Sequence, residues 1–156
     1  MRQQYWLMKT DPDDFSLDDF KKRPDKTEPW DGVRNFQARN FMRDKMRIGD
    51  SVLFYHSGKN PAVVATARIV SKAYPDFTAW DPDSKHFDAK STPEKPIWYL
   101  VDIRLEKEFF RPLTLTELKK VATLKDMILL RKGNRLSVFP VTAAEYHTIV
   151  KMAETK

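Results

Sequence analysis

The chain of 156 residues contains no cysteine. This absence excludes disulfide bonds, thiolate nucleophiles and every zinc site built on cysteine, and it suits a reducing cytoplasm. No stretch approaches the roughly 18 apolar residues that a membrane-spanning helix needs. The first residues contain neither an apolar segment nor a small-residue cleavage site. We therefore expect no signal peptide and a cytoplasmic location, or a nuclear one in a eukaryote.

Motifs that mark catalytic or cofactor sites are also missing. The sequence has no GxGxxG or Walker loop, so a nucleotide cofactor is not expected. The three histidines lie in different regions, and none has the i, i+4 partner of a helical metal site. His56 and Ser57 are neighbours on a predicted strand, where side chains point to opposite faces, and no GxSxG motif surrounds the serine. We predict that the protein is not an enzyme and holds no metal or cofactor.

Basic residues outnumber acidic ones, and both kinds are unevenly distributed along the chain. The formal net charge is +6. Residues 34–47 contain five basic side chains against one acidic, residues 119–135 contain six against one, and acidic residues gather at 11–19. A basic balance favours a polyanionic partner because neutralising phosphates releases counterions. A plain solvated surface explains the same charges about equally well.

The order of predicted elements is typical of an α+β domain. Apolar patterning and turn residues predict strands at residues 5–9, 50–56, 62–71, 97–109 and 136–140. Capping residues and helical spacing predict helices over 17–22, 35–46 and 124–132, with two more starting at Thr114 and Thr142. Residues 21–29 and 74–96 are polar, proline-bearing loops. This order lacks alternating βαβ units and predicts one domain over residues 1–156, built on a mixed or closed sheet.

One segment combines an aromatic ring, an amide and a cation. Trp30 precedes a predicted helix in a loop, where helix periodicity does not require it. It could be a lid packed on the core or an aromatic face that stacks on a base. Asn35 could be the helix N-cap or an amide that reads a base edge, and Arg34 could bind phosphate. Ser57, at a strand end, could add a hydroxyl.

Longer segments carry a family resemblance. They are YWLMKTDP at 5–12, WDGVRNFQARNFM at 30–42, VLFYHS at 52–57 after Gly49-Asp50, AYPD at 73–76, and RLSVFPV at 135–141. The chain resembles the EVE domain of the PUA-like group, and the resemblance covers nearly the whole chain. The resemblance implies a small, strongly curved β-barrel with flanking helices. It also implies nucleic-acid binding, in several members with a flipped, modified base such as methylated or hydroxymethylated cytosine in DNA.

The resemblance also implies a set of site residues. Those of the base pocket are Trp30 as the wall, Asn35 and Ser57 at the base edge, and Tyr55 and Trp98 as further walls. Those of the rim or the phosphate contacts are Lys9, Arg34, Arg39, Arg43 and Arg131. We predict a monomer that binds DNA or RNA without catalysing a reaction.

Three other functions remain open at this stage. An RNA-binding module would read a modified base in structured RNA, and competition between matched RNA and DNA oligonucleotides would identify it. An enzyme acting on nucleic acid or a small ligand would lose activity when His56 is replaced. A protein-interaction adaptor would keep its partner after nuclease treatment.

Overall fold

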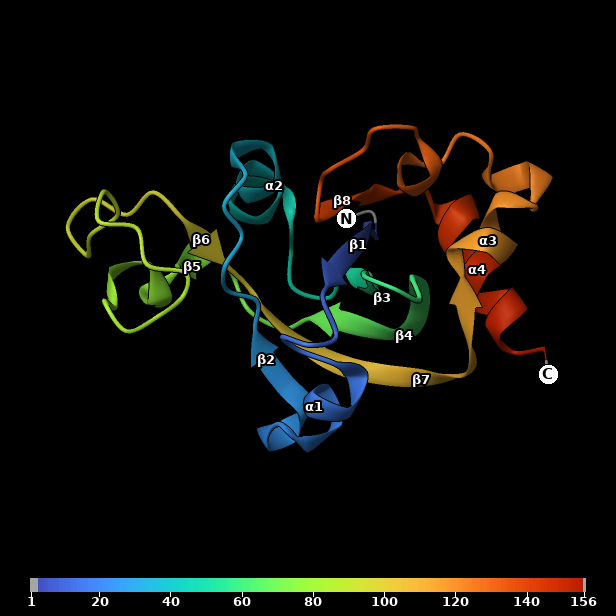
Figure 1. Cartoon of the computed structure of the whole chain (residues 1–156), viewed down its shortest axis with the longest axis horizontal. Helices are drawn as coiled ribbons and strands as arrows, with labels where there is room; N and C mark the ends of the chain where they lie inside the picture. The colour runs from blue at the N-terminus through green and yellow to red at the C-terminus, as the bar shows by residue number, and fades with distance from the viewer. Residues whose placement is uncertain (1–2, 156) are drawn as a thin grey trace.

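The computed structural model describes residues 3–155 and centres on a six-stranded sheet (Figure 1). In spatial order its strands are β2 (Thr27–Pro29), β7 (Asp102–Thr114), β4 (Ala62–Ile69), β3 (Ser51–His56), β1 (Tyr5–Thr10) and β8 (Val138–Val141). β1 and β3 run parallel, and the other neighbouring pairs are antiparallel. The sheet is therefore mixed, as predicted.

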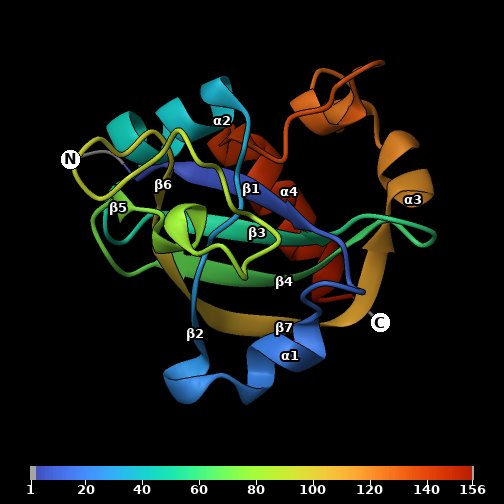
Figure 2. The same cartoon turned by 60° about the vertical axis from the view of Figure 1, so that its left-hand side comes forward.

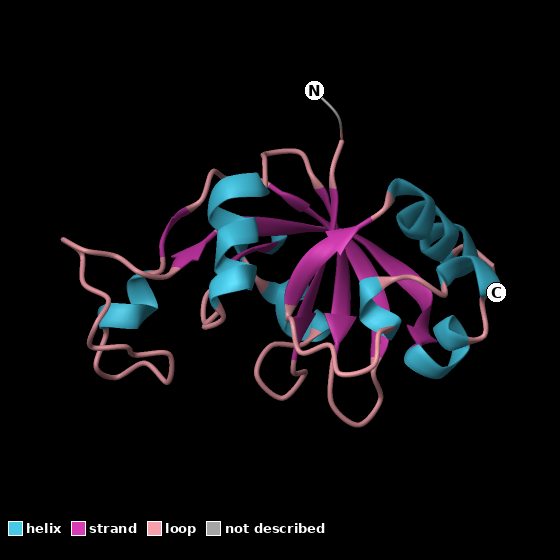
Figure 3. Ribbon diagram, turned by 90° about the horizontal axis from the view of Figure 1, so that it is seen from above, coloured by secondary structure: helices cyan, strands magenta, loops and turns pink. Residues whose placement is uncertain are grey.

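The sheet is strongly curled. β4 loses register once against β3, near Val64, and twice against β7. Such bulges bend a strand and increase its twist. Seen from above, the strands fan out from one end of the sheet (Figure 3). Because β2 and β8 form its two edges, the result is an open half-barrel, which confirms the predicted curved α+β fold.

Four α-helices flank the sheet: α1 (Leu17–Lys22), α2 (Phe36–Asn40), α3 (Leu115–Lys119) and α4 (Ala143–Ala153). Reciprocal capping boxes, Ser16 with Asp19 and Thr142 with Glu145, begin α1 and α4 as predicted. At α3 only Thr114 caps, because the carboxylate of Glu117 binds Arg111 at 2.7 and 2.8 Å. Among residues 3–155, no helix is long and apolar enough to cross a membrane.

Side chains of the central strands alternate between two hydrophobic cores. Trp6, Met8 and Phe54 belong to the core that α1 and α2 cover. Leu7, Leu53 and Tyr55 belong to the core that α3 and α4 cover. Successive strand residues point to opposite faces, so one sheet supports both cores. Figure 2 shows α4 behind the strands of the sheet.

A small lobe, residues 74–100, projects from one end of the sheet (Figure 1). It begins and ends with two paired strands, β5 (Tyr74–Pro75) and β6 (Tyr99–Leu100). Between them lie a 3-10 turn, Phe77–Trp80, and a loop. The backbone N–H of Asp76 donates to the Trp98 carbonyl at 2.8 Å, and Trp98 Nε1 donates to Asp88 Oδ2 at 2.7 Å. The predicted long loop is thus closed on itself by hydrogen bonds.

Some predicted elements were wrong. The helix expected over residues 124–132 is replaced by two 3-10 turns, Ala122–Leu124 and Ile128–Leu130, with Met127 in an extended conformation between them. Leu124, Met127 and Leu129 are all buried, so packing overrides helix propensity here. The helix expected over 35–46 is α-helical only to Asn40 and continues as a π-helical turn, Phe41–Lys45. The loop expected over 21–29 contains the edge strand β2.

Candidate nucleic-acid interface

A cavity of about 470 Å³ opens beside the end of β1. Its walls come from residues within 9–15, Arg23, residues 28–34, residues 84–86 and Ser137. These segments are distant in sequence, and the curled sheet and the lobe bring them together. The volume lies in the range of about 300–1,000 Å³ that is typical of small-ligand sites.

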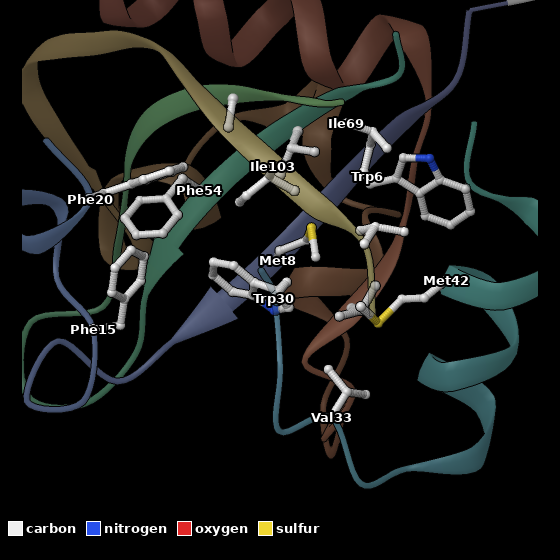
Figure 4. Close-up of a cluster of buried hydrophobic side chains, with 14 of the residues drawn as sticks. Trp6, Met8, Phe15, Phe20, Trp30, Val33, Met42, Phe54, Ile69 and Ile103 are labelled. Atoms are coloured by element: carbon white, nitrogen blue, oxygen red, sulfur yellow. The ribbon is translucent and has the colours of Figure 1, made fainter. Parts of the chain in front are cut away.

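Trp30 forms part of the wall and part of the core. Its ring meets those of Phe15 and Phe54 edge-on, with centroids 6.2 and 5.8 Å apart (Figure 4). Only 7% of Trp30 is exposed, and its backbone N–H donates to the Val101 carbonyl at 2.8 Å. The indole N–H has no hydrogen-bond partner within residues 3–155, yet it is not sealed from solvent. The core therefore fixes the ring, and the cavity reaches its remaining surface.

The loop after Trp30 is tied to the lobe by one buried carboxylate. Asp76 Oδ2 accepts hydrogen bonds from the backbone N–H of Gly32 at 2.8 Å and from Arg34 Nη1 at 3.0 Å. Burial alone would raise the pKa of Asp76, but hydrogen bonds from Thr78, Gly32 and Arg34 outweigh it and lower that pKa. Asp76 thus stays ionised and holds the cavity wall in place.

Gly32 allows the lobe to approach this loop closely. Its φ is +81°, a conformation that favours glycine. A Cβ atom at this position would lie 2.5 Å from His86 Cε1, closer than non-bonded atoms approach. Arg34 Nη2 also donates to the His86 carbonyl at 2.6 Å. The imidazole of His86 is therefore packed on the glycine, in the wall of the cavity.

Most cations of the cavity wall are already paired with carboxylates. The three pairs are Arg23 Nε with Glu28 Oε1 at 2.8 Å, Lys85 Nζ with Asp14 Oδ1 at 2.6 Å, and Arg34 Nη1 with Asp76 Oδ2 at 3.0 Å. Arg34, predicted at the rim, is thus a structural tie between two loops as well as a wall residue. The wall is mixed in charge and is not uniformly basic.

Lys9 is the cation of the wall that keeps its charge uncompensated. No carboxylate of the described residues 3–155 lies within ion-pair distance of it. Its Nζ lies 5.7 Å from the ring centroid of Tyr55 and 5.5 Å from that of Phe139. Burial lowers the pKa of Lys9. The ammonium lies on the side of the sheet that α3 and α4 cover, and an anion that reached it would meet no competing carboxylate within residues 3–155.

Asn35 and Ser57 do not line the cavity. Asn35 Oδ1 accepts from the backbone N–H of Ala38 at 3.0 Å, which confirms the N-cap reading of this residue. The Ser57 hydroxyl donates to the Thr10 carbonyl at 3.3 Å, so it lies behind a residue of the wall. Their roles in reading a base stay predictions.

Tyr55 and Trp98 also lie outside the lining. Tyr55 is buried in the core on the opposite face of the sheet from Trp30, and burial raises its pKa to about 12. Trp98 stacks on Phe36 with a centroid distance of 4.9 Å, and the Arg34 guanidinium lies 5.5 Å from its ring centroid. The Tyr55 ring thus contacts the Lys9 ammonium, and the Trp98 ring contacts the Arg34 guanidinium.

The other predicted phosphate contacts lie around the cavity and not in it. Arg39 Nη1 donates to the Ile97 carbonyl at 2.9 Å and so joins α2 to the lobe. Arg43 pairs with Asp44 at 2.8 Å. Arg131 is exposed in the turn that follows Ile128–Leu130. No carboxylate of residues 3–155 pairs with Arg39 or Arg131.

His56 and Ser57 do not form a catalytic pair. His56 Nε2 accepts from the backbone N–H of Leu17 at 3.0 Å, at the start of α1. Burial lowers the pKa of His56 and favours this neutral acceptor. Within residues 3–155, no group of three or more histidine or acidic side chains could hold a metal ion.

Sequence reasoning missed three residues that shape the cavity: Asp31, Asp76 and His86. Asp31 and Asp76 belong to the segments WDGVRN and AYPD, so their place in the segments that carry the family resemblance was the available signal. His86 lies inside the long loop of the lobe, and no local pattern indicates that it packs on Gly32.

Comparisons with known proteins agree with the fold. The family model for the EVE domain matches residues 4–152. Thymocyte nuclear protein 1 of Danio rerio is 39% identical, over 94% of this chain and 71% of that protein. A solved structure of a protein from Leishmania major is 49% identical, with a TM-score of 0.92 over 98% of this chain and 96% of that one. The structure of human THYN1 protein in complex with DNA containing 5-methylcytosine is 35% identical, with a TM-score of 0.92 over 99% of both chains. The chain, with its PUA-like fold, belongs to the EVE domain family.

Proposed function

We propose that this protein binds DNA without catalysing a reaction and accepts one flipped, modified cytosine in the cavity beside Trp30. The observation that carries the proposal is the open cavity of about 470 Å³ with an indole fixed in its wall. The human relative that was solved with 5-methylcytosine DNA supports the choice of ligand. The same relationship supports a nuclear location if the source is a eukaryote.

Binding proceeds in two parts. Basic residues around the cavity, with Lys9 in its wall and Arg39 and Arg131 outside it, contact the phosphates, so affinity falls as salt rises. The target nucleotide then rotates out of its stack at a cost of a few kcal/mol. Stacking on Trp30 recovers about 1–3 kcal/mol, and the 5-methyl group adds apolar contact.

The remaining predicted residues take supporting places in this proposal. The Asn35 side chain is exposed at the start of α2, and its amide nitrogen has no hydrogen-bond partner within residues 3–155, so it remains a candidate reader at the mouth. Ser57 positions Thr10, Tyr55 supports Lys9, and Trp98 supports Arg34.

Replacing the indole tests the proposal. Trp30→Leu keeps an apolar side chain in the core but removes the flat π-face, so affinity for a duplex with one 5-methylcytosine should fall by about 1–3 kcal/mol. Binding to the unmodified duplex, which depends on phosphates, should change little. Fluorescence anisotropy at one fixed salt concentration measures both values, and circular dichroism checks the fold.

Trp80→Leu is the matched control, because Trp80 lies in the lobe and does not line the cavity. It should leave the preference for the modified duplex intact. If Trp30→Leu also leaves that preference intact, the cavity is not the base site. A matched RNA competitor that displaces the DNA at lower concentration than DNA itself would favour the RNA-reading alternative.

A further inference from the structure

A pocket for 5-methylcytosine must also reject thymine. Both bases carry the same methyl group on C5, so stacking and apolar contact accept either one. They differ at position 4, where cytosine has an amino donor and thymine has a carbonyl acceptor. A side chain in the cavity that accepts hydrogen bonds and does not donate them distinguishes the two bases at this position.

Four carboxylates line the cavity, and three are engaged elsewhere. Asp14 binds Lys85 at 2.6 Å and Glu28 binds Arg23 at 2.8 Å. Asp11 Oδ1 accepts from the backbone N–H of Asp13 at 2.9 Å within an exposed turn. Asp31 is the fourth: its own backbone N–H donates to its carboxylate, and no other residue of the described range 3–155 gives it a hydrogen bond or an ion pair.

Asp31 lies in the cavity wall beside Trp30. It directly follows Trp30, and its backbone N–H donates to the Pro29 carbonyl at 3.0 Å, which holds the turn. The residue is half-buried. Burial raises its pKa and the charge of Asp76 adds to this effect, whereas His86, the hydrogen bond from its own backbone N–H and Arg34 oppose it. A half-buried carboxylate that receives no hydrogen bond from another residue is costly, and a ligand amino group would supply such a hydrogen bond.

We propose that Asp31 selects a base with an exocyclic amino group, cytosine over thymine, by accepting a hydrogen bond from that group. The inference rests on the proposed function and deepens it. Thymine in the same orientation would place its O4 against the carboxylate, so two acceptors would face each other.

The test compares two duplexes that carry 5-methylcytosine or thymine at one position. Each base is placed opposite an abasic site, so that the cost of extruding it is similar. The wild-type protein should bind the 5-methylcytosine duplex about tenfold or more tightly. Asp31→Asn introduces an amide that can donate to O4, so it should bring the ratio to parity or invert it, with a gain in thymine binding. Asp31→Ala should weaken 5-methylcytosine binding without that gain.

Asp13→Asn is the control, because it makes the same charge change on the neighbouring turn outside the cavity wall. It should keep the wild-type ratio. Suppose that binding still depends on Trp30. An unchanged ratio of the two affinities in Asp31→Asn, or an equal loss of affinity for both duplexes, then overturns the role of Asp31 and leaves the proposed function standing. If binding depends neither on the base nor on Trp30, the proposed function fails together with this inference.

Discussion

At the scale of single residues, several side chains of this protein both build the fold and shape the cavity. Trp30 packs against Phe54 in the core while it forms the cavity wall. Arg34 lies in the wall while it binds Asp76 and the His86 carbonyl. Because each is held by several contacts, a ligand meets a wall that is already ordered, which lowers the entropy cost of binding.

His56 gives the fold a measurable dependence on pH. Its pKa is lowered by burial, and its neutral Nε2 accepts from the Leu17 N–H. The unfolded chain binds the proton more readily than the folded one, so stability is fully present above about pH 6.5 and is lost as pH falls below it. His56→Gln should flatten the decline in the free energy of unfolding between about pH 7 and pH 5.5, measured by urea titration.

His147→Gln serves as the comparison, because His147 contacts Tyr5 at the surface and no backbone N–H donates to it within residues 3–155. That variant should keep the wild-type pH dependence. Equal slopes for wild type and His56→Gln would show that His56 does not carry the effect.

Residue roles that depend on near neighbours could be predicted from the sequence. Asn35 was expected as a possible N-cap, and it accepts from Ala38, three residues ahead. The packing of His86 on Gly32 joins positions more than fifty residues apart, and no local pattern encodes such a contact. For the same reason the motif WDGVRN does not indicate that Asp31 lines a cavity without an ion-pair partner within residues 3–155.

At the scale of elements, the helical segment that follows the cavity loop differs from an ideal helix. α2 gives way to the π-helical turn at Phe41, where the backbone N–H of Met46 donates to the Phe41 carbonyl at 2.9 Å. An inserted i→i+5 turn shifts the following side chains around the helix axis. Arg39 and Arg43 still lie side by side, because both guanidiniums donate to Asn40 Oδ1, at 2.8 and 3.4 Å. Arg39 reaches the lobe, and Arg43 pairs with Asp44.

Arg39 is the residue of this element that we expect to contact phosphate. Arg39→Gln removes the charge but keeps an amide that can donate to the Ile97 carbonyl. Binding should weaken by a similar factor for modified and unmodified DNA, and the slope of log Kd against log salt should fall by about 1. Arg104→Gln, on β7 where Arg104 pairs with Asp25, should leave the slope unchanged. A loss confined to the modified duplex would contradict a phosphate contact.

The starts of helices were predicted correctly where capping residues mark them, as at Ser16 and Thr142. Elements were predicted wrongly where tertiary packing determines them. The turns between Ala122 and Leu130 bury Leu124, Met127 and Leu129, and β2 exists only because it pairs with β7. A three-residue edge strand ending in proline has too little pattern of its own to be predicted.

At the scale of the whole molecule, the cavity is a product of topology. The end of β1, the segment after β2, the lobe and the residue before β8 meet only because the sheet curls and the lobe folds back beside α2 (Figure 1). The order of strands and helices predicted the fold class, and the resemblance of several long segments predicted the curved sheet. Neither could give the charge pairing of the wall, since each ion pair there depends on the final positions of separate loops.

The most direct measurement follows a ¹³C-labelled 5-methyl group in a DNA duplex by nuclear magnetic resonance on adding the protein. If the base enters the cavity, the methyl resonance shifts under the indole ring current and shows nuclear Overhauser contacts to the Trp30 ring protons. Those contacts disappear in Trp30→Leu. A methyl group that keeps its free-duplex shift in the bound complex, or that contacts only residues outside the cavity, would contradict capture of the base beside Trp30.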